Sequence, residues 1–281
     1  MPELPEVETT RRGIEPWLAQ QTLTGWQVRN PRLRWPVDIP AALKGQSIEA
    51  VRRRGKYLLI CFTSGTLIIH LGMSGSLRIL EPQTPLLVHD HVDLMLSNGK
   101  VLRFNDPRRF GCVLYQPGDA PDRHALLASL GPEPLGNEFS GAYLYQKSRN
   151  RKVAIKNFIM DAKIVVGVGN IYAAEALYLA GIRPATGAGR IPRFGYERIA
   201  DGIRHVLRKA LAEGGTTLRD YVGSDGQPGY FRQQLNVYGR QGKACRRCNT
   251  VLKLQILGQR SSVYCPSCQS SVKFTVETAD I

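Results

Sequence analysis

The 281-residue sequence lacks a long uninterrupted apolar segment and the features of a secretory signal. Its longest apolar stretch, residues 165–182, carries Asn170 and Glu175, which argues against a membrane span. The first fifteen residues are acidic and have no apolar centre, so they do not look like a signal peptide. We therefore expect a cytoplasmic protein with no membrane partner.

Acidic residues are scarce relative to basic ones. The chain has 23 Asp and Glu against 38 Lys and Arg, which gives a formal net charge of +15. Such an excess is typical of proteins that bind a polyanion, and nucleic acid is the favoured partner. A membrane surface and a merely basic soluble protein are the alternatives on charge alone. The hydrophobic share of 43% and the length suit a folded protein of about two domains.

Cysteines are few, and most of them are clustered. Four of the six form two Cys-x2-Cys pairs separated by sixteen residues: Cys245, Cys248, Cys265 and Cys268. Without a secretion signal, metal binding is favoured over disulfides, and this spacing is typical of a tetrahedral zinc site. Four thiolates leave no open coordination position, so one structural Zn²⁺ is predicted. Cys61 and Cys112 lie in apolar runs and are predicted to be core residues.

The segment around these cysteines contains no acidic residue. Residues 237–273 hold seven Lys or Arg and no Asp or Glu. A small basic hairpin held by a metal suits a DNA groove or a row of phosphates. Arg260 lies between the two cysteine pairs, where the hairpin tip is expected. The alternative for Arg260 is an ordinary solvated arginine.

The rest of the chain divides into a strand-rich part and a helical part. After an opening helix at about residues 5–19, short apolar or alternating runs lie in residues 22–30, 56–72 and 91–104. Ser-Gly and Asn-Gly turns inside the last two runs predict hairpins, and such spacing favours a sandwich or barrel. Residues 130–136, with two prolines and two glycines, read as a linker. From about 140 to 220 the apolar spacing is helical.

A glycine turn begins the helix expected within residues 167–184. We predict that Asn170 caps this helix and that Gly181 ends it. A helix N-terminus with exposed amides is an anion site, although a tight interhelical turn explains the glycines as well. The Gly-Lys-Ser/Thr of a nucleotide P-loop is absent, which argues against nucleotide binding. The net charge favours a phosphate grip.

The chain begins Met1-Pro2, with carboxylates at Glu3, Glu6 and Glu8. One interpretation is an ordinary helix start, with Pro5 in the first turn and acids at the positive end. In the other interpretation, removal of Met1 turns Pro2 into a free secondary amine. The first residues of the chain do not by themselves decide between these two interpretations.

Two further short segments are predicted to be turns that expose side chains able to contact DNA. Residues 70–75 carry His70 and Met73, and residues 105–111 carry Arg108 and Phe110. Apolar residues at such positions are usually core. On a basic protein they are also suited to act as wedges that fill the space left by an extruded base.

Seven motifs along the chain together resemble one family. They are PELPEVETTRRGIEP, HLGMSGSLRIL, HDHVDL, NDPRRFG, VVGVGNIY, SDGQPGYF and the two Cys-x2-Cys pairs. In this order they resemble bacterial formamidopyrimidine-DNA glycosylase, which removes oxidised purines, chiefly 8-oxoguanine and formamidopyrimidines, and cleaves the strand at the abasic site. The resemblance implies an α+β multidomain fold. It places an N-terminal β-sandwich with an N-terminal helix at 2–130, a helix-two-turn-helix domain at 136–220 and a β-hairpin zinc finger at 237–271.

The resemblance also implies catalytic roles. Pro2 would attack C1′ of the damaged nucleotide as the nucleophile, and Glu3 would act as the general acid. Glu6 would orient the site as a second carboxylate. Lys56 would serve β-elimination and contact a phosphate, and Arg260 would serve δ-elimination.

The same resemblance implies DNA contacts and a monomer that binds double-stranded DNA with oxidised bases or abasic sites. His89, Arg108 and Arg151 would contact DNA, and His70 and Asn170 would grip phosphates near the lesion. Met73, Arg108 and Phe110 would fill the gap left by the flipped nucleotide. The segment 217–229 would close over the extruded base, and Lys156 is a weaker candidate near that pocket.

Two rival functions share part of this pattern. An endonuclease VIII-like glycosylase for oxidised pyrimidines would share Pro2, Glu3 and the zinc. A non-catalytic zinc-ribbon protein that binds nucleic acid would need the charge and the cysteines, but it has no use for an amine beside Glu3. The opening motif and the separate Met73 and Phe110 turns favour the purine enzyme.

Overall fold

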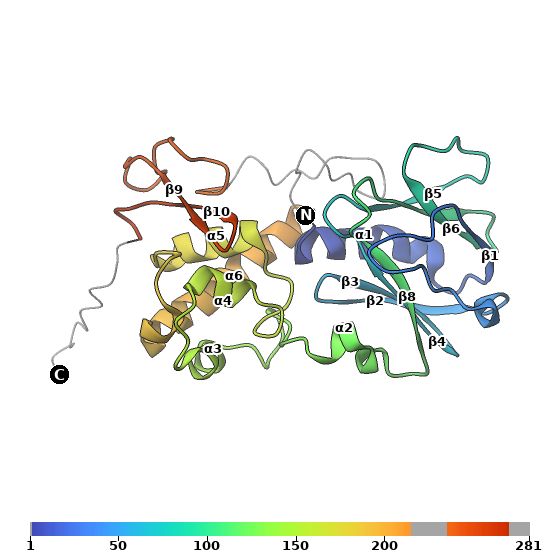
Figure 1. The fold of residues 1–281 in the computed structure, drawn as a ribbon, viewed down its shortest axis with the longest axis horizontal. Helices are drawn as coiled ribbons and strands as arrows, with labels where there is room; N and C mark the ends of the chain where they lie inside the picture. The colour runs from blue at the N-terminus through green and yellow to red at the C-terminus, as the bar shows by residue number, and fades with distance from the viewer. Residues whose placement is uncertain (1, 215–234, 270–281) are drawn as a thin grey trace. The chain divides into compact units, whose positions relative to one another are not determined.

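The computed structural model describes residues 2–214 and 235–269 (Figure 1). The predicted closing segment 217–229 therefore lies outside the described residues. The described chain forms two compact units. The first unit holds residues 2–130 and the end of the last long helix from residue 210. The second unit holds residues 131–209 and 235–269.

The first unit begins with helix α1, Leu4–Leu18, and continues mainly as strands. Its strands are β1 Leu23–Val28, β2 Ile48–Arg54, β3 Tyr57–Phe62, β4 Gly65–His70, β5 Ser76–Leu80, β6 Asp90–Leu96, β7 Val101–Asn105 and β8 Cys112–Pro117. Its short helical segments are η1 Ala41–Leu43, η2 Pro121–Arg123 and α2 Ala125–Ala128. The predicted opening helix is confirmed, with each end one residue earlier than expected.

The strands form two antiparallel four-stranded sheets, in the orders β1-β6-β7-β5 and β2-β3-β4-β8. The predicted hairpins are β3–β4 and β6–β7. Gly65, which begins β4 directly after the first turn, has no room for a side chain, because a Cβ there would lie 2.4 Å from the carbonyl oxygen of Gln116 in β8. Gly99 at the second turn has a φ of +78°, which favours glycine. The sandwich expected from the sequence is confirmed.

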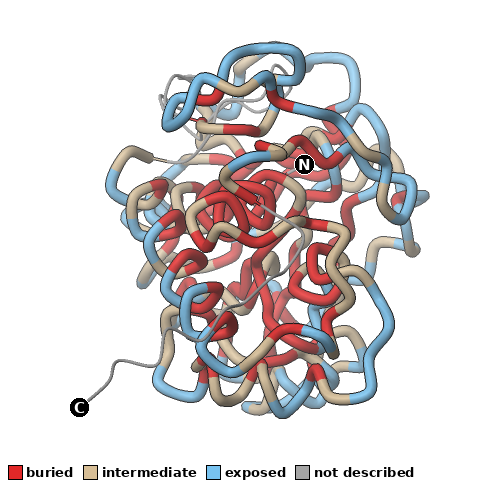
Figure 2. The backbone as a smooth tube through the Cα atoms, turned by 90° about the vertical axis from the view of Figure 1, so that its left-hand side faces the viewer, coloured by how far each residue is buried: buried red, intermediate tan, exposed pale blue. Residues whose placement is uncertain are grey.

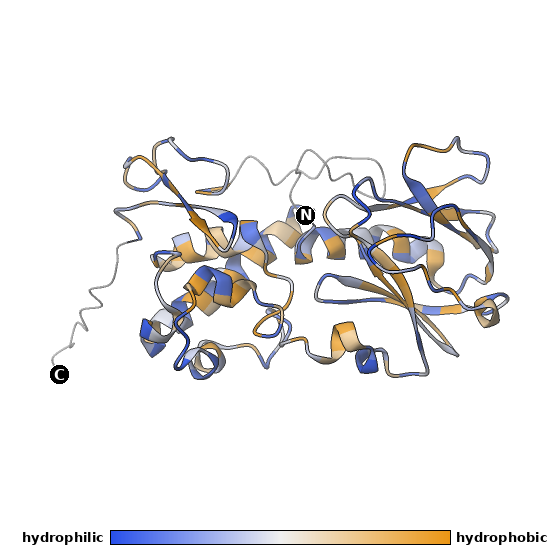
Figure 3. Cartoon of the chain, in the orientation of Figure 1, coloured by the Kyte–Doolittle hydropathy of each residue, from blue (hydrophilic) through white to orange (hydrophobic). Residues whose placement is uncertain are grey.

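One apolar core fills the sandwich and includes side chains from α1 and from both sheets. Helix α1 contributes Val7, Ile14 and Leu18, which repeat at helical spacing and are nearly inaccessible. Burying one such side chain stabilises the fold by about 1.5–3 kcal/mol. Figure 3 shows the apolar strands in orange, and Figure 2 shows the buried backbone in red inside the exposed loops. The core therefore holds α1 against the sheets along its length.

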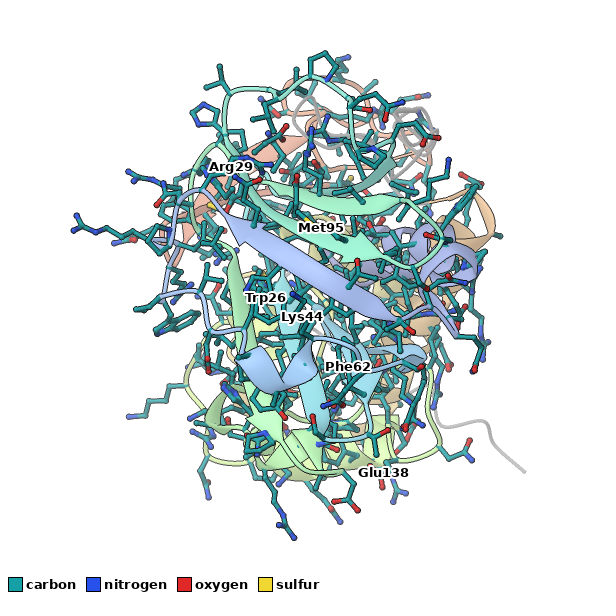
Figure 4. All side chains as sticks on the ribbon, turned by 90° about the vertical axis from the view of Figure 1, so that its right-hand side faces the viewer. Trp26, Arg29, Lys44, Phe62, Met95 and Glu138 are labelled. Carbon is teal, nitrogen blue, oxygen red and sulfur yellow. The ribbon has the colours of Figure 1, made fainter. Side chains whose placement is uncertain are left out.

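The other face of the β1-β6-β7-β5 sheet carries buried charges. Arg103 makes a two-pronged ion pair with Asp93, at 2.9 and 3.0 Å, and both side chains are almost fully buried. Arg29, which follows the end of β1 in Figure 4, donates to the same carboxylate at 2.6 Å. The Arg103 guanidinium also donates to the carbonyl oxygen of Thr84. These bonds attach the residues ahead of β6 to the face of the sheet.

The second unit is helical and ends in a small hairpin. Its helices are α3 Gly141–Ser148, α4 Ile155–Met160, α5 Asn170–Ala180 and α6 Arg193–Ala212, with the short segment η3 Ala188–Arg190. Strands β9 Lys253–Leu257 and β10 Arg260–Tyr264 form the antiparallel hairpin. No helix among residues 2–214 and 235–269 combines the length and the apolar character that crossing a membrane requires.

Helix α5 is buried on almost every side and begins differently from the prediction. The N-cap residue is Gly169, and Asn170 is already the first helical residue without a capping bond. The prediction that Asn170 caps the helix is therefore wrong, because the glycine takes the extended cap conformation itself. The end is as predicted: Gly181 has a φ of +70° in the left-handed region.

A buried carboxylate on α5 connects this helix to the chain that enters the hairpin. Glu175 accepts hydrogen bonds from the backbone N–H groups of Asn236, Val237 and Tyr238, at 2.8 to 3.0 Å. It is 3% exposed, so these bonds form out of contact with water. The start of the hairpin module is thereby fixed to α5.

Candidate functional site

Pro2, Glu3 and Glu6 are all buried at the start of α1. Glu3 is the N-cap residue, and it forms a capping box with Glu6. The backbone N–H of Glu3 donates to Oε2 of Glu6 at 2.8 Å. The terminus is therefore a capped helix, as the simpler interpretation expected. It also buries two carboxylates within four residues of Pro2 in the sequence, and burying carboxylates is costly.

Glu8, one turn further along α1, has a different environment. Burial alone would raise the pKa of its carboxyl, but hydrogen bonds from Arg11 and Arg12 outweigh burial and hold that pKa below its usual value. Arg53 of β2 adds a third ion pair at 3.2 Å. Glu8 therefore serves as an anchor between α1 and β2, and it is distinct from the Glu3 and Glu6 pair.

Lys56 and His70 lie close to each other at one end of the β3–β4 hairpin of the second sheet. Lys56 is partly buried and immediately precedes β3, and its neighbour Tyr57 pairs with His70 at the end of β4. The rings of Tyr57 and His70 are 4.8 Å apart. His70 therefore ends a strand and is not on the turn that the sequence suggested. The sheet register therefore places Lys56, in the turn before β3, near His70 at the end of β4.

The environment of His70 keeps its ring neutral. Burial, together with the positive charges of Lys56 and Arg34, lowers the pKa of His70 to about 4. The ring Nδ1 lies 2.9 Å from the backbone N–H of Gly72 and accepts its hydrogen bond. The remaining proton of the neutral ring is therefore assigned to Nε2. His70 is set up as a neutral hydrogen-bond donor at neutral pH.

Lowering the pH from about 6.5 to about 4 is expected to destabilise the first unit through His70. In this window the unfolded histidine binds a proton and the folded one does not, so stability falls as the pH falls. The full shift corresponds to at most about 3 kcal/mol. Thermal melting of wild type and His70→Gln across this range should show a steeper loss for the wild type. Parallel pH profiles would contradict the assignment.

Met73 and Phe110 are exposed at one end of the sandwich, at 37% and 43% of their surfaces. Met73 belongs to the turn after β4, and Phe110 belongs to the loop before β8. Because His70 pairs with Cys112 across these two strands, the turn and the loop are neighbours. The guanidinium of Arg108 lies 4.9 Å from the centre of the Phe110 ring. The structure thus brings the three predicted gap-filling residues onto adjacent loops.

His89 is exposed immediately before β6 and has a φ of +76°. A non-glycine residue is uncommon in this conformation and is held there by its surroundings. Its carbonyl oxygen accepts a hydrogen bond from the backbone N–H of Asp106 at 3.1 Å. The stretch that carries His89 is therefore attached to the start of the loop that carries Arg108 and Phe110.

The second unit carries the remaining predicted DNA contacts. Arg151 is exposed between α3 and α4, and Asn170 begins α5. The Oδ1 atom of Asn170 is buried and accepts no hydrogen bond from the described residues. Arg260 is exposed and begins β10, directly after the turn at Gly258 and Gln259. The predicted tip position of Arg260 is confirmed.

Lys156 has a structural position that the sequence did not reveal. Its side chain is fully buried. The Nζ atom donates to the carbonyl oxygen of Ser261 at 2.7 Å and to Oγ of Ser262 at 2.8 Å. Both partners belong to β10 and follow Arg260 directly. Lys156 therefore fastens helix α4 to the strand that begins with Arg260.

The four clustered cysteines converge on one point. Their sulfur atoms all lie within 4.8 Å of one another. The separations Cys248–Cys268, Cys248–Cys265 and Cys245–Cys268 are 3.3, 3.4 and 3.9 Å. Sulfurs at about 2.3 Å from a tetrahedral zinc would be separated by just under 4 Å, so the cage fits one Zn²⁺. The other two cysteines, Cys61 and Cys112, lie in β3 and β8, as predicted.

Backbone bonds and a buried tyrosine support the cage. The backbone N–H groups of Arg247 and Cys268 lie 3.4 and 3.3 Å from the sulfurs of Cys245 and Cys265. The Tyr178 hydroxyl lies 3.3 Å from the Cys245 sulfur and can donate to a thiolate there. Tyr178 is on α5, so the metal cage rests on the helix that begins at Asn170.

Sequence reasoning missed the buried polar residues that hold these sites in place. They include Asp106, within the NDPRRFG motif, and Glu175, within the expected helix. Their burial was not visible in the sequence, because it depends on packing against distant parts of the chain, such as Ser74 for Asp106 and residues 236–238 for Glu175. From the local sequence, Asp106 is only an acidic residue in a loop, and Glu175 is only an acidic residue in a helix. Nothing in either pattern indicates burial.

Three family models match successive parts of the chain. They are the formamidopyrimidine-DNA glycosylase N-terminal domain over residues 1–113, the formamidopyrimidine-DNA glycosylase H2TH domain over residues 130–222, and the zinc finger found in FPG and IleRS over residues 242–270. Together the three matches extend over most of the sequence.

Curated relatives match at high identity over nearly their whole length. Formamidopyrimidine-DNA glycosylase of Alcanivorax borkumensis is 58% identical over 270 residues, covering 96% of this chain and 100% of the relative. The protein of the same name from Magnetococcus marinus is 57% identical over 273 residues, covering 96% and 99%.

Solved structures share the fold. A variant Lactococcus lactis FPG in complex with Fapy-dG-containing DNA has a TM-score of 0.89 at 31% identity, covering 96% of this chain and 100% of that one. The MutM (FPG) protein of Thermus thermophilus has a TM-score of 0.86 at 35% identity, covering 95% and 98%. With the buried Pro2–Glu3 start, the sandwich and the four-cysteine cage, these matches show that the chain belongs to the formamidopyrimidine-DNA glycosylase family.

Proposed function

We propose that this protein is a base-excision repair DNA glycosylase with AP lyase activity that removes 8-oxoguanine and formamidopyrimidines from double-stranded DNA. The observation that carries the proposal is the buried start of α1, where Pro2 precedes a nearly inaccessible Glu3. Support comes from the family and from a solved MutM at 32% identity in complex with DNA containing carbocyclic 8-oxo-G.

Pro2 is suited to be the nucleophile once Met1 is removed. An α-amino group with a pKa of about 7.8 is roughly 15% neutral at pH 7, against about 0.04% for an ordinary lysine. The nitrogen attacks C1′ of the damaged nucleotide as the bond to the base breaks. The iminium that follows ring opening has no N–H proton to lose, so it stays charged and accepts electrons during elimination.

Glu3 is suited to supply the proton that drives this step. As a general acid it protonates the ring oxygen of the sugar, which opens the ring while Pro2 holds C1′. Glu6 accepts the Glu3 N–H at 2.8 Å, so it holds the acid and the adjoining amine in one arrangement. Glu8 has no part in this chemistry, because arginines already neutralise its charge.

Strand cleavage follows from the same iminium. Loss of a proton from C2′ expels the 3′-phosphate by β-elimination, and a second elimination expels the 5′-phosphate. We assign Lys56 to the first elimination and to a phosphate contact, and Arg260 to the second. Both side chains are at least partly exposed at the edge of a strand, where they can meet the backbone of the substrate.

The remaining exposed residues are assigned to holding the DNA. His70 donates to a phosphate through its neutral ring, and Asn170 binds a phosphate at the start of α5. His89, Arg108 and Arg151 contact the DNA, and Met73, Arg108 and Phe110 fill the gap left by the flipped nucleotide. The segment 217–229, which lies outside the described residues, is proposed to close over the extruded base.

We also propose the domain limits 2–130, 136–220 and 237–271 and a monomeric protein that works in the cytoplasm on the nucleoid. The decisive experiment measures excision from duplexes that carry either 8-oxoguanine or an oxidised pyrimidine, each opposite several bases. Faster excision of 8-oxoguanine supports the proposal. Preference for the pyrimidine lesion would instead favour an endonuclease VIII-like specificity.

Replacing Cys248 by serine is expected to remove zinc and DNA binding together and to leave the first unit folded. A structural zinc can contribute roughly 10–16 kcal/mol to the folding of a finger, and this module has a small apolar core. Zinc content, DNA affinity and melting of the first unit would be measured. Cys61→Ser, outside the cage, should keep its zinc and serves as the control. A Cys248→Ser protein with one zinc per chain and normal affinity would refute the expectation.

A further inference from the structure

The carboxylate of Asp106 has no role in the chemistry proposed above, yet it is fully buried between functional loops. Its Oδ2 accepts a hydrogen bond from the backbone N–H of Gly111 at 2.8 Å. Its Oδ1 accepts from the backbone N–H of Arg108 and from Oγ of Ser74, both at 3.3 Å. A buried carboxylate is costly unless it is hydrogen-bonded, so these donors determine where it can lie.

These side-chain bonds connect two separate loops. Arg108 and Gly111 belong to the loop before β8, residues 106–111, which we call the wedge loop. Ser74 belongs to the turn after β4, residues 71–75, which we call the Met73 turn. One carboxylate thus holds the wedge loop closed and attaches the Met73 turn to it.

The backbone of Asp106 reaches a third segment. Its N–H donates to the carbonyl oxygen of His89 at 3.1 Å, and its carbonyl oxygen lies 2.8 Å from Nε2 of His91. The same oxygen accepts from the N–H of Arg109 at 3.2 Å. The stretch around His89 is therefore fixed to the residue that holds the other two loops.

Close backbone packing leaves the Met73 turn and the wedge loop little room to move separately. A Cβ on Gly72 would lie 2.5 Å from the nitrogen of Gly111 and 2.6 Å from the carbonyl carbon of Phe110. A Cβ on Gly111 would lie 2.5 Å from the carbonyl oxygen of His70. Only glycines allow this approach, and Gly72 also has a φ of +62°.

We propose that Asp106 is a positioning residue that makes the Met73 turn, the wedge loop and His89 one rigid element for inserting side chains into the DNA. The inference rests on the proposed function, since it gives Met73, Arg108 and Phe110 their gap-filling role. Extruding a base costs a few kcal/mol. If the loops that carry Met73, Arg108 and Phe110 are already ordered, contacts of these side chains with the DNA offset this cost directly. Mobile loops would first lose conformational entropy, which would reduce the net gain in free energy.

The test compares Asp106→Asn with Asp119→Asn on two substrates. Asparagine has the size of aspartate, but an NH₂ group replaces one of the two carboxylate oxygens. The backbone N–H of either Arg108 or Gly111 therefore loses its acceptor. Asp119 is exposed, and its replacement gives the same change in net charge. The substrates are a duplex that carries 8-oxoguanine, which requires base extrusion, and a single-stranded abasic oligonucleotide, which does not.

For Asp106→Asn we expect excision from the duplex to fall by about 10- to 100-fold. A shift of about 1 Å in groups that position a substrate can lower an enzyme's rate by up to about 100-fold. Borohydride trapping on the single strand should stay at the wild-type level. Asp119→Asn should match the wild type on both substrates. A merely structural role for Asp106 would reduce activity on both substrates in parallel with the melting temperature, and that result would overturn the inference.

A second variant keeps the test decisive if Asp106→Asn fails to fold. Ser74→Ala removes only the bond from the Met73 turn, and Ser74 is partly exposed. It should lower duplex excision selectively, by a smaller factor. Wild-type ratios of duplex to single-strand activity in the folded variants would overturn the inference. Failure of the wild type itself to form an adduct with abasic DNA would instead overturn the proposed function.

Discussion

A chain with even one residue ahead of Pro2 is expected to give no covalent adduct with abasic DNA after borohydride reduction. The nitrogen of Pro2 is then part of an amide, and resonance with the carbonyl removes the electron pair that would attack C1′. Loss of a nucleophile typically costs several orders of magnitude in rate, here roughly 10³-fold or more. The measurement is the fraction of labelled DNA that becomes covalently attached to protein.

The matched control restores the amine in the same protein. A removable N-terminal extension is cleaved by a protease immediately before Pro2, and the adduct should return. Binding to DNA that carries a stable abasic analogue, measured before and after cleavage, shows whether the extension disturbs the surroundings of the buried Pro2. If the extended chain, confirmed intact by mass spectrometry, forms the adduct as well as the cleaved one, Pro2 is not the nucleophile. Lys56 is then the next amine to examine.

Glu3→Gln is expected to separate base release from the reaction at a preformed abasic site. A positioned general acid contributes about 10²–10⁴-fold, so excision of 8-oxoguanine should fall within that range. An abasic site exists partly as an open aldehyde, which Pro2 can attack without this acid. Trapping on abasic DNA should therefore persist. The measurements are single-turnover excision and borohydride trapping on matched duplexes.

The structure defines the control that this variant needs. Glu3 is also the N-cap of α1, and loss of a cap costs about 0.5–2 kcal/mol. Glutamine keeps one acceptor oxygen, so the cap and the melting temperature should be largely retained. Glu6→Gln alters the other partner of the capping box without removing the acid, and it should lose less excision than Glu3→Gln. If Glu3→Gln loses trapping and excision equally, Glu3 is not a dedicated acid for base release.

Much of the architecture could be predicted because its signals are local. The spacing of Cys245, Cys248, Cys265 and Cys268 predicts a zinc cage, and their sulfurs do converge. The Ser-Gly and Asn-Gly turns predict hairpins, and both are confirmed. The cap of α5 was predicted wrongly, since Gly169 takes the position assigned to Asn170. Both residue types are common at helix starts, so the local pattern places a cap only to within one residue.

The structure fixes where the predicted site residues lie. The structure places Met73, Arg108 and Phe110 on adjacent loops of the first unit, and it places Arg260 at the start of β10 in the second. It also shows that Lys156 is fully buried against β10. What Pro2, Glu3, Lys56 and Arg260 do chemically stays a prediction, which the adduct and excision experiments decide.

By itself, the sequence determined the family, the charge suited to a polyanion, the zinc ligands and the broad order of an opening helix, a strand-rich part, a helical part and a cysteine module. Each of these depends on composition, on spacing along the chain or on turn residues. Only the tertiary structure decided that His70 is neutral and that Asp106 holds the Met73 turn, the wedge loop and His89 together. The charges that act on His70 come from Lys56 and Arg34, and Asp106 is bonded to Ser74 and His89. Only folding brings these distant groups together, so neither property can be deduced from local sequence.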